Sequence, residues 1–316
     1  MDGIDFAICI SLIMNSRVPY RQLAEKFNMS VNSIHKRIKN LVKLGVIERF
    51  FTQFSGLVHS FTSMVMFGTS NAIDVEEILP NLGNHECIYN VTQASSNLIY
   101  LHARIRSINE LESLVSFVKQ VGEVDKPNIG LIPELPDGAG PAIEETGGSG
   151  DRGLSNLDFL IVNSLKDNSR KLITEVAQEV RASTKTVKRR LTRLIEKNLV
   201  HFSIDWYPDK SNDILSIFIL KLNPHLNLDK MNLMRTLRKQ YGQNLAFSWV
   251  FSNLPNLMLV CFWTNTMKEL QRIESSIKSE KFESVTATIL LRGANYPTWQ
   301  DKYLEAKIKE INANSN

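Results

Sequence analysis

Two stretches of this chain are versions of one sequence. Residues 5–51 and residues 158–204 align without a gap, so that equivalent positions lie 153 residues apart. Ser16-Arg17 returns as Ser169-Arg170, and Ser30 returns as Ser183. Self-similarity of this kind marks the duplication of a structural unit. Whatever one copy does, the chain therefore does twice.

The hydrophobic pattern of each copy predicts three short helices followed by a strand. In the first copy, only Asn28 and Met29 separate the second helical stripe from the third, and Ser30 is placed to cap the third helix through its hydroxyl oxygen. Two helices joined by so tight a turn are typical of a helix-turn-helix motif. After the third helix, Gly45-Val46-Ile47 and its counterpart Asn198-Leu199-Val200 start an apolar strand, the beginning of a wing.

Basic charge is concentrated on the third helix of each copy. The segment from Ser30 to Gly45 carries a net charge of +4, and the segment from Ser183 to Asn198 carries +5. The whole chain carries only +4, so the rest of the chain is net acidic. Positive charge focused on a candidate recognition helix is what binding to DNA phosphates requires. We expect the second copy, which is the more basic, to bind non-specific DNA more tightly.

The helix face left for DNA follows from the apolar positions. With Val31, Ile34, Ile38 and Leu41 turned inward, the outward residues are polar or basic. Those near the helix start are expected to read base edges in the major groove, and the later basic ones to hold phosphates. A solvated helix face and a docking surface for another protein are the alternatives. The predicted DNA-binding residues are Asn32, Ser33, His35, Lys36, Arg37 and Lys39, then Lys185, Thr186, Lys188, Arg189, Arg190 and Arg193, with Thr192 on the same face.

The sequence pattern of the two copies resembles that of the Lrp/AsnC family of bacterial and archaeal transcription regulators. In the second copy, Val176-Ala177 and Asn198-Leu199-Val200 depart from the family's Leu-Ala and Gly-Val-Ile. The resemblance implies a tandem-duplicated transcription regulator with double-stranded DNA as its partner, no catalytic activity and no cofactor. The family's pattern is met in the first copy by Asp5, Ser16-Arg17, Leu23-Ala24, Ser30, Arg37, Leu41 and Gly45-Val46-Ile47.

The segment after each copy reads strand, helix, strand, strand, helix, strand. This order predicts a ferredoxin-like βαββαβ sheet with helices on one face, similar to the domain that follows the helix-turn-helix in the Lrp/AsnC family. The expected fold class is therefore α+β, with two winged helix-turn-helix domains, each followed by a ferredoxin-like domain. Ser107 with Glu110, and Thr266 with Glu269, are placed as capping boxes. The expected elements span residues 61–67, 73–79, 86–93, 98–106, 108–121 and 128–132, then 215–222, 230–241, 246–251, 257–264, 267–277 and 285–291.

The domain boundaries follow from these patterns. The segment from Pro133 to Gly150 is rich in Pro, Gly, Ser and acidic residues, and its composition predicts a flexible tether. Residues 299–311 read as an extra helix without a counterpart after the first half. We expect helix-turn-helix domains at 1–54 and 154–207, sheet domains at 55–132 and 208–295, the linker at 133–153, and a C-terminal helix and tail at 296–316.

The turn between the two central strands of each half departs from the family. The family often has there a glycine, which lets a ligand approach the backbone, and an aspartate, which pairs an ammonium group and so helps to bind an amino acid. Neither residue is present in residues 94–97 or 252–256. Turns favour Ser and Asn in any case. The residues left to line a polar effector site are Ser95, Ser96, Asn97, Ser252, Asn253 and Asn256.

Two other functions stay open. Siroheme decarboxylases share this architecture as paired or fused halves, and they depend on His and Arg residues of the central strands. The matching stretches here, residues 87–93 and 247–251, contain neither residue type. No side chain there would grip a tetrapyrrole carboxylate or protonate the product carbon. The other option is a scaffold that binds the transcription machinery and not DNA.

Metal ligands and reactive groups are sparse in the sequence. His85-Glu86-Cys87 has no second Cys or His pair at metal spacing, so no metal site is expected. Cys9, Cys87 and Cys261 stand singly in apolar stretches, as reduced core residues do. No apolar run is long enough to cross a bilayer. We therefore expect a cytoplasmic protein without a membrane partner.

The strands of the second half predict how the chain assembles. Phe247 and Trp249 lie beside either Phe262 or Cys261 and Trp263, according to the register, so both strand faces are apolar. Only one face can lie under helices, and the other is expected to pack against another sheet. We expect the two sheet domains to pair within one chain, and whole chains to form a homodimer.

Overall fold

The computed structural model describes residues 1–56, 58–133, 153–226, 228–278 and 281–314. The chain divides into two compact units. The sheet unit comprises Met1–Phe6, Thr62–Pro133 and Pro208–Tyr296, and the helix-turn-helix unit comprises Ala7–Phe61, Glu134–Tyr207 and Pro297–Asn316. The tether expected at 133–153 lies, apart from its two end residues, outside the described residues.

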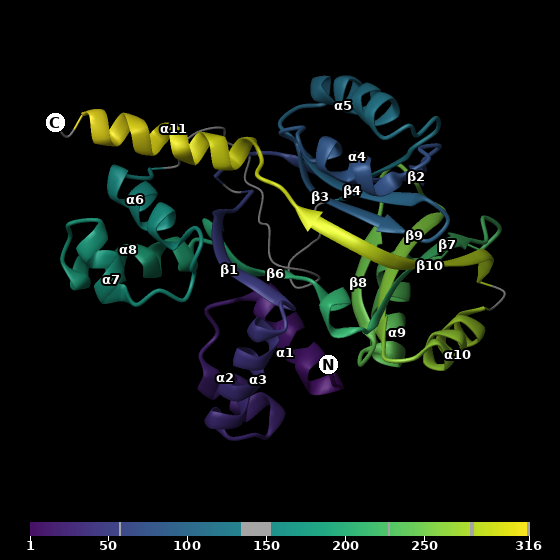
Figure 1. Ribbon diagram of the computed structural model, residues 1–316, viewed down its shortest axis with the longest axis horizontal. Helices are drawn as coiled ribbons and strands as arrows, with labels where there is room; N and C mark the ends of the chain where they lie inside the picture. Colours follow the sequence, from purple (N-terminus) through teal and green to yellow (C-terminus); the bar gives the residue numbers. More distant parts are fainter. Residues whose placement is uncertain (57, 134–152, 227, 279–280, 315–316) are drawn as a thin grey trace. The chain divides into compact units, whose positions relative to one another are not determined.

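The sheet unit contains two copies of a ferredoxin-like arrangement, as the sequence predicts (Figure 1). A 3-10 turn, η1 (Pro208–Ser211), precedes the second copy. The fold class is α+β. The first copy is β2 (Thr62–Thr69), α4 (Val75–Leu82), β3 (Ile88–Ala94), β4 (Leu98–Ile105), α5 (Asn109–Val121) and β5 (Asn128–Leu131). The second is β7 (Ile214–Leu222), α9 (Lys230–Tyr241), β8 (Leu245–Val250), β9 (Leu257–Thr264), α10 (Met267–Ile277) and β10 (Phe282–Asn295).

The two copies share one eight-stranded sheet with the order β5-β2-β4-β3-β10-β7-β9-β8. Strand β10 joins them, because its first part pairs with β7 (Val285 with Leu220) and its last part pairs with β3 (Gly293 with Thr92). Figure 1 shows β10 as one yellow arrow. The strand predicted at 285–291 is therefore shorter than β10, which spans Phe282–Asn295. The apolar periodicity stops before the residues that pair with β3. The expected pairing of the sheet domains within one chain is present.

One face of the second-half strands lies under helices. Phe218, Val260 and Phe262 form a core with residues of α9 and α10, such as Leu233 and Leu270. Side chains alternate along a strand, so the neighbours of these residues lie on the opposite face. The sequence left the register between β8 and β9 open. In the structure Phe247 pairs with Cys261, and Trp249 pairs with Leu259.

The opposite face packs against the first half of the sheet unit. The ring of Trp249 lies 5.4 Å from that of His102 on β4, measured between centroids. The Tyr100 hydroxyl of β4 lies 2.9 Å from Thr288 Oγ1 of β10, at hydrogen-bonding distance. The prediction that the second apolar face packs on the partner half is confirmed by these contacts. Burial there, together with the smaller effect of the positive charge of Arg104, lowers the pKa of His102 to about 4.

This histidine predicts an acid-sensitive sheet unit. In the unfolded chain His102 titrates near 6.5, so as the pH falls from 6.5 towards 4 the unfolded state binds the proton first and the folded state loses stability. The loss is expected to reach up to about 3 kcal/mol. His102→Gln should flatten the decline of the unfolding free energy across this pH window, measured by urea titration. The same substitution at exposed His225 is the control, and a decline that is equal in both variants would contradict the assignment.

The capping predictions have mixed outcomes. Thr266 caps α10, since its Oγ1 accepts from Glu269 N at 3.2 Å while Glu269 Oε2 accepts from Asn265 N at 3.0 Å. The box expected at Ser107 is wrong, because α5 has Ile108 as its N-cap without a side-chain bond. There the Glu110 carboxylate instead accepts from Arg106 N at 2.7 Å and from Arg106 Nε at 2.6 Å.

The helix-turn-helix unit is built from the two sequence copies. The copies give α1 (Gly3–Met14), α2 (Tyr20–Phe27), α3 (Val31–Lys43) and β1 (Ile47–Phe54), then α6 (Asn156–Leu165), α7 (Ile173–Glu179), α8 (Thr184–Glu196) and β6 (Val200–Trp206). The expected extra helix is present as α11 (Trp299–Ala313). Its residues Leu304 and Ile311 share a core with Phe159 of α6 and with Phe54 of β1.

The two wings pair with each other. Strands β1 and β6 form an antiparallel ribbon in which Phe50 pairs with Ile204 and Phe51 pairs with Ser203. With the repeat offset of 153 residues, Ile204 is the counterpart of Phe51, and Ser203 is the counterpart of Phe50. Each central pair therefore maps onto the other when the copies are exchanged. The ribbon thus relates the two copies by a local two-fold axis, as in an isologous dimer interface.

Candidate nucleic-acid interface

The turn that separates the last two helices is built alike in both copies. Asn28 and its counterpart Arg181 adopt left-handed backbone conformations, with φ of 51° and 52°. Asparagine takes this conformation readily, and arginine does so less often. Ser30 Oγ then accepts from Ser33 N at 3.1 Å, and Ser183 Oγ accepts from Thr186 N at 3.1 Å. The capping predicted for the third helix is confirmed in both copies.

The buried faces of α3 and α8 hold each helix against its own domain. The buried residues are Ile34, Ile38 and Leu41 on α3, and Val187, Leu191 and Leu194 on α8. The inward placement predicted for Val31 is wrong, because its side chain is 45% exposed. Val31 is the first residue of the helix, where no preceding turn covers it.

Most predicted DNA-binding side chains lie on the exposed face. Ser33 and Thr186 are half-buried, and their hydroxyls lie 2.9 Å from those of the cap residues Ser30 and Ser183. Arg37 is also half-buried. The fully exposed members are Asn32, His35, Lys36 and Lys39 of α3 and Lys185, Lys188, Arg189 and Thr192 of α8. Their contact with DNA stays a prediction.

Two of the predicted arginines have a structural partner. Arg190 Nη1 lies 3.3 Å from Asp158 Oδ2, and Arg193 Nη1 lies 3.6 Å from the same oxygen. The Asp158 side chain is 0% exposed and also accepts from Ser155 N at 2.8 Å, which closes the capping box of α6. These guanidinium groups therefore brace α8 against α6. Sequence alone did not reveal this, because the partner lies 32 residues away from Arg190.

The repeated Ser-Arg pair forms a joint between the two copies. The sequence alone did not indicate this joint. Ser16 Oγ and Ser169 Oγ are 2.6 Å apart and buried. Arg17 Nη1 donates to Lys171 O at 3.4 Å, and Arg170 Nη2 donates to Val18 O at 2.9 Å. Val18 and Lys171 are counterparts, so these bonds obey the two-fold relation of the ribbon. Burial lowers the pKa of both arginines, as expected for cations packed into a joint.

The joint reaches the first recognition helix. The guanidinium of Arg170 lies 4.4 Å from the centroid of the Tyr20 ring, and the Tyr20 ring meets His35 of α3 edge-on at 5.6 Å. The counterpart of Tyr20 is Ile173, which carries no ring. The aromatic contact that links the joint to the recognition helix is therefore present in the first copy and has no aromatic equivalent in the second.

Several residues predicted for an effector site bind the strands of the opposite half. Ser95 Oγ accepts from Ile289 N of β10 at 3.1 Å. The Asn253 side chain donates to Ile129 O at 2.7 Å and accepts from Leu131 N at 2.8 Å, both of β5. Ser252 N donates to Leu131 O at 2.9 Å. Effector binding by Ser95, Ser96, Asn97, Ser252, Asn253 and Asn256 stays a prediction, and the contacts observed here join the two halves of the sheet unit.

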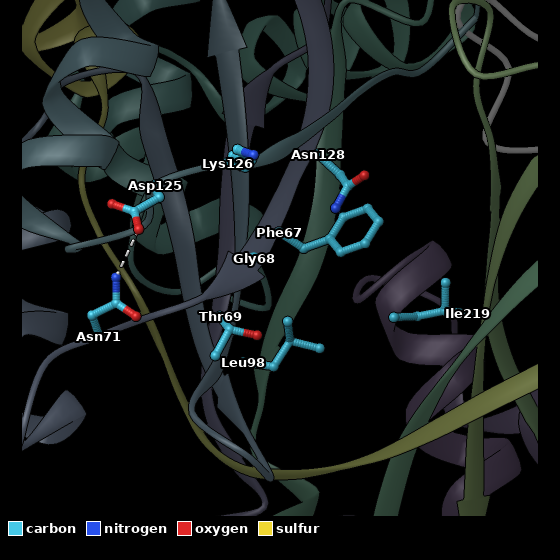
Figure 2. Close-up of a pocket in the computed structure, with 9 residues that line it drawn as sticks. All are labelled: Phe67, Gly68, Thr69, Asn71, Leu98, Asp125, Lys126, Asn128 and Ile219. Carbon is cyan, nitrogen blue, oxygen red and sulfur yellow. Dashed lines mark hydrogen bonds between the residues drawn. The ribbon is translucent and has the colours of Figure 1, made fainter.

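A pocket of about 490 Å³ opens in the sheet unit and is shown in Figure 2. Its apolar lining comes from Phe67, Leu98 and Ile219. Asp125 lines it beside Lys126, and Asp125 Oδ2 accepts from Asn71 Nδ2 at 3.1 Å, the dashed line in Figure 2. Opposite charges over an apolar floor suit a small molecule that carries both an acidic and a basic group.

The cysteines and the candidate metal ligands form no separate cluster in the described part of the chain. Cys9, Cys87 and Cys261 are buried and free of disulfides. Among the described residues, no three or more His, Cys, Asp or Glu side chains gather as metal ligands. Over the same residues, no helix combines the length and apolar character needed to span a membrane.

Known proteins share both the units and their duplication. The winged helix-turn-helix DNA-binding family matches the chain twice, over residues 1–48 and 154–201. An uncharacterized HTH-type transcriptional regulator of Pyrococcus furiosus is 29% identical over 139 residues, which are 43% of this chain and 93% of that protein. The HTH-type transcriptional regulator LysM of Sulfurisphaera tokodaii is 28% identical over 127 residues, 37% of this chain and 90% of that protein. Each relative is thus covered almost completely by less than half of this chain.

A solved structure matches the whole chain. The siroheme decarboxylase NirDL, in complex with an iron-uroporphyrin III analogue, aligns over 99% of this chain and 100% of its own, with a TM-score of 0.59 and 12% identity. At this identity the match shows a common fold. Two family matches, relatives that correspond to one half, and a fold shared along the whole length agree with the sequence repeat. The chain thus contains two winged helix-turn-helix DNA-binding domains and is a tandem duplication of a unit similar to HTH-type transcriptional regulators.

Proposed function

We propose that one chain binds a single DNA duplex with α3 and α8 together and regulates transcription from that site. The observation that carries the proposal is the repetition of one arrangement: a serine cap, a buried apolar stripe and an exposed basic face in both copies. The ribbon and the Ser-Arg joint hold these copies in a two-fold relation. Two helix-turn-helix units related by a two-fold axis are what adjacent major grooves accept.

The exposed residues divide by position along each helix. Asn32 and Lys185 stand in the first turn, where side chains reach base edges, and Lys36 and Arg189 stand one turn later. Lys39 is placed for a phosphate. Arg190 and Arg193, which pair with Asp158, contribute chiefly by holding α8 in position.

Arg189→Ala is expected to weaken DNA binding and to lower the salt dependence of binding. If the guanidinium of Arg189 grips one phosphate, the slope of log K against log salt falls by about 1. Fluorescence anisotropy across a salt series measures both quantities. Arg235→Ala, an exposed arginine on α9, is the matched control and should leave both unchanged. An Arg189→Ala protein with wild-type slope and affinity would remove this residue from the interface.

A genome-wide pull-down of bound DNA tests the proposed function itself. Recovery of a defined set of promoter fragments supports regulation, and the fragments name the targets. A protein scaffold would recover no DNA and would not be retained on immobilised duplex at low salt. Retention that disappears at moderate salt separates the DNA binder from the scaffold.

The pocket of Figure 2 extends the proposal to a small-molecule effector. Its charged residues, Asp125 and Lys126, favour a ligand with both charges, and its lining includes Ile219 of the second half. A ligand there would contact both halves of the sheet unit. Thermal shift against a panel of zwitterions, with Asp125→Asn as the comparison, would detect such an effector.

The proposal includes a homodimer of whole chains, as the Lrp/AsnC resemblance implies, and the cytoplasm as the compartment that holds the DNA. Light scattering at micromolar concentration should then give twice the 35.9 kDa mass of one chain. Within one chain, the two halves already share a sheet through β10. A mass of one chain at this concentration would rule out the dimer and leave DNA binding by the monomer intact.

Tetrapyrrole decarboxylation is the second candidate, because NirDL shares the fold over the full length. Strand β4 does contain a histidine and an arginine, His102 and Arg104. They lie outside residues 87–93 and 247–251, the stretches that match the central strands of the decarboxylases. A pKa of about 4 keeps the His102 imidazole neutral at pH 7, and Arg104 stacks on Tyr89 at 4.5 Å. These features supply no proton donor at neutral pH. Incubation with siroheme decides the matter, since a chain that retains the tetrapyrrole through gel filtration absorbs visible light.

A further inference from the structure

The two recognition helices present different chemistry at equivalent positions. With the repeat offset of 153 residues, Asn32 corresponds to Lys185, His35 to Lys188, Lys36 to Arg189 and Lys39 to Thr192. All eight side chains are exposed. The first copy thus offers an amide and an imidazole where the second offers two ammonium groups.

These differences have predictable base preferences. Asparagine forms a bidentate pair with N6 and N7 of adenine, whereas lysine and arginine donate to O6 and N7 of guanine. The first copy has Asn32 in the opening turn of α3, and the second has Lys185 in the opening turn of α8. Half-sites read by the two copies should therefore differ in sequence, with guanine favoured under α8.

The joint fixes the order and orientation in which the half-sites are read. The β1–β6 ribbon, the Ser16–Ser169 contact and the two arginine bonds connect the copies at their two-fold axis. His35 is additionally oriented by Tyr20, which Arg170 covers. Unlike two flexibly tethered domains, copies joined in this way accept one spacing between half-sites.

We propose that the operator of this chain is non-palindromic: two different half-sites, A under α3 and B under α8, in inverted orientation at one fixed spacing. The proposal rests on the DNA-binding function proposed above and goes beyond it. A regulator made of identical subunits reads the same half-site twice. Fusion of two copies removes that constraint, and the exposed residues of α3 and α8 have diverged while the joint between them has kept its symmetry.

Selection from a random duplex library with the full chain tests the proposal. The expected consensus is A–B, and its affinity should exceed those of the A–A and B–B palindromes by at least about tenfold, because each mismatched base pair costs roughly 1–3 kcal/mol. Inserting about half a helical turn, near five base pairs, between the half-sites should remove the preference.

An exchange of the exposed residues provides the decisive variant. Asn32→Lys, His35→Lys, Lys36→Arg and Lys39→Thr together give α3 the exposed side chains of α8, and the preferred duplex should change from A–B to B–B. The reverse exchange on α8 should give A–A, and it serves as a second test if the first variant fails to fold. A palindromic consensus, or an unchanged preference in a folded variant, would overturn the proposal while leaving DNA binding in place. Absence of salt-sensitive binding to any duplex would overturn the proposed function instead.

Discussion

Replacing Asp158 with alanine is expected to lower the free energy of unfolding of the helix-turn-helix unit by roughly 2–4 kcal/mol. The Asp158 carboxylate is fully buried, closes the capping box of α6 through Ser155, and pairs with Arg190 and Arg193. Its loss removes the cap and leaves two cations beside a buried space. Because both arginines keep about a third of their surface in water, the loss stays below that of a wholly buried pair. Urea unfolding followed by circular dichroism measures the change.

Asp301 supplies the matched control for this prediction. It closes the same kind of capping box at α11, where it accepts from Thr298 N at 2.8 Å. Its ion pair with Lys166 is long at 3.9 Å, and its side chain is partly exposed. Asp301→Ala should therefore cost only about 1 kcal/mol. Equal losses for Asp158→Ala and Asp301→Ala would show that the arginine pairs add nothing.

Reversing the charge of Lys188 and Arg189 together is expected to abolish measurable DNA binding by the full chain at physiological salt. Both side chains are exposed on α8, the more basic recognition helix. The Lys188→Glu, Arg189→Glu protein loses two cations and places two carboxylates against the phosphates. The expected loss of affinity exceeds about a hundredfold, because each replaced contact costs roughly 1–3 kcal/mol before repulsion is counted. Anisotropy with a labelled duplex measures it.

The same reversal on another helix separates local contact from overall charge. Arg235 and Lys239 are exposed on α9 and have the charge of the pair on α8. Arg235→Glu with Lys239→Glu lowers the net charge of the chain equally and should weaken binding by less than about threefold at physiological salt, where charges beyond the Debye length are screened. Comparable losses in the two proteins would mean that binding follows net charge, and that α8 is no recognition helix.

Local periodicity predicted most of the fold. The strands and helices of both halves, the serine caps of α3 and α8, and α11 lie where apolar spacing and capping residues place them, because these signals act within a few residues. Val31 shows the limit of that reasoning. Its apolar side chain fits the helical stripe, yet its position at the first turn of α3 leaves it exposed.

Pairings across the repeat were beyond local signals. The extension of β10 to β3 depends on residues 290–295 meeting residues 90–94, and neither segment indicates the other in its sequence. The recurrence of Ser16-Arg17 as Ser169-Arg170 is visible in the sequence, where it marks only the duplication. Its meaning required the structure, since the two pairs act on each other and not within their own domains. Similarly, the sequence predicts Arg190 and Arg193 as DNA contacts, whereas in the structure both pair with the buried carboxylate of Asp158.

Strand β10 also constrains the order of events during synthesis. The edge of β3 (Ile88–Ala94) is completed by residues 290–295, which follow it by nearly 200 residues in the sequence. Until those residues leave the ribosome, the first sheet presents unpaired backbone groups along β3, which is the kind of edge that promotes association with other chains. Closing so long a loop is slow relative to local hairpin formation. The completed edge of the first-half strands therefore depends on a strand that is made only after the second half has been largely synthesised.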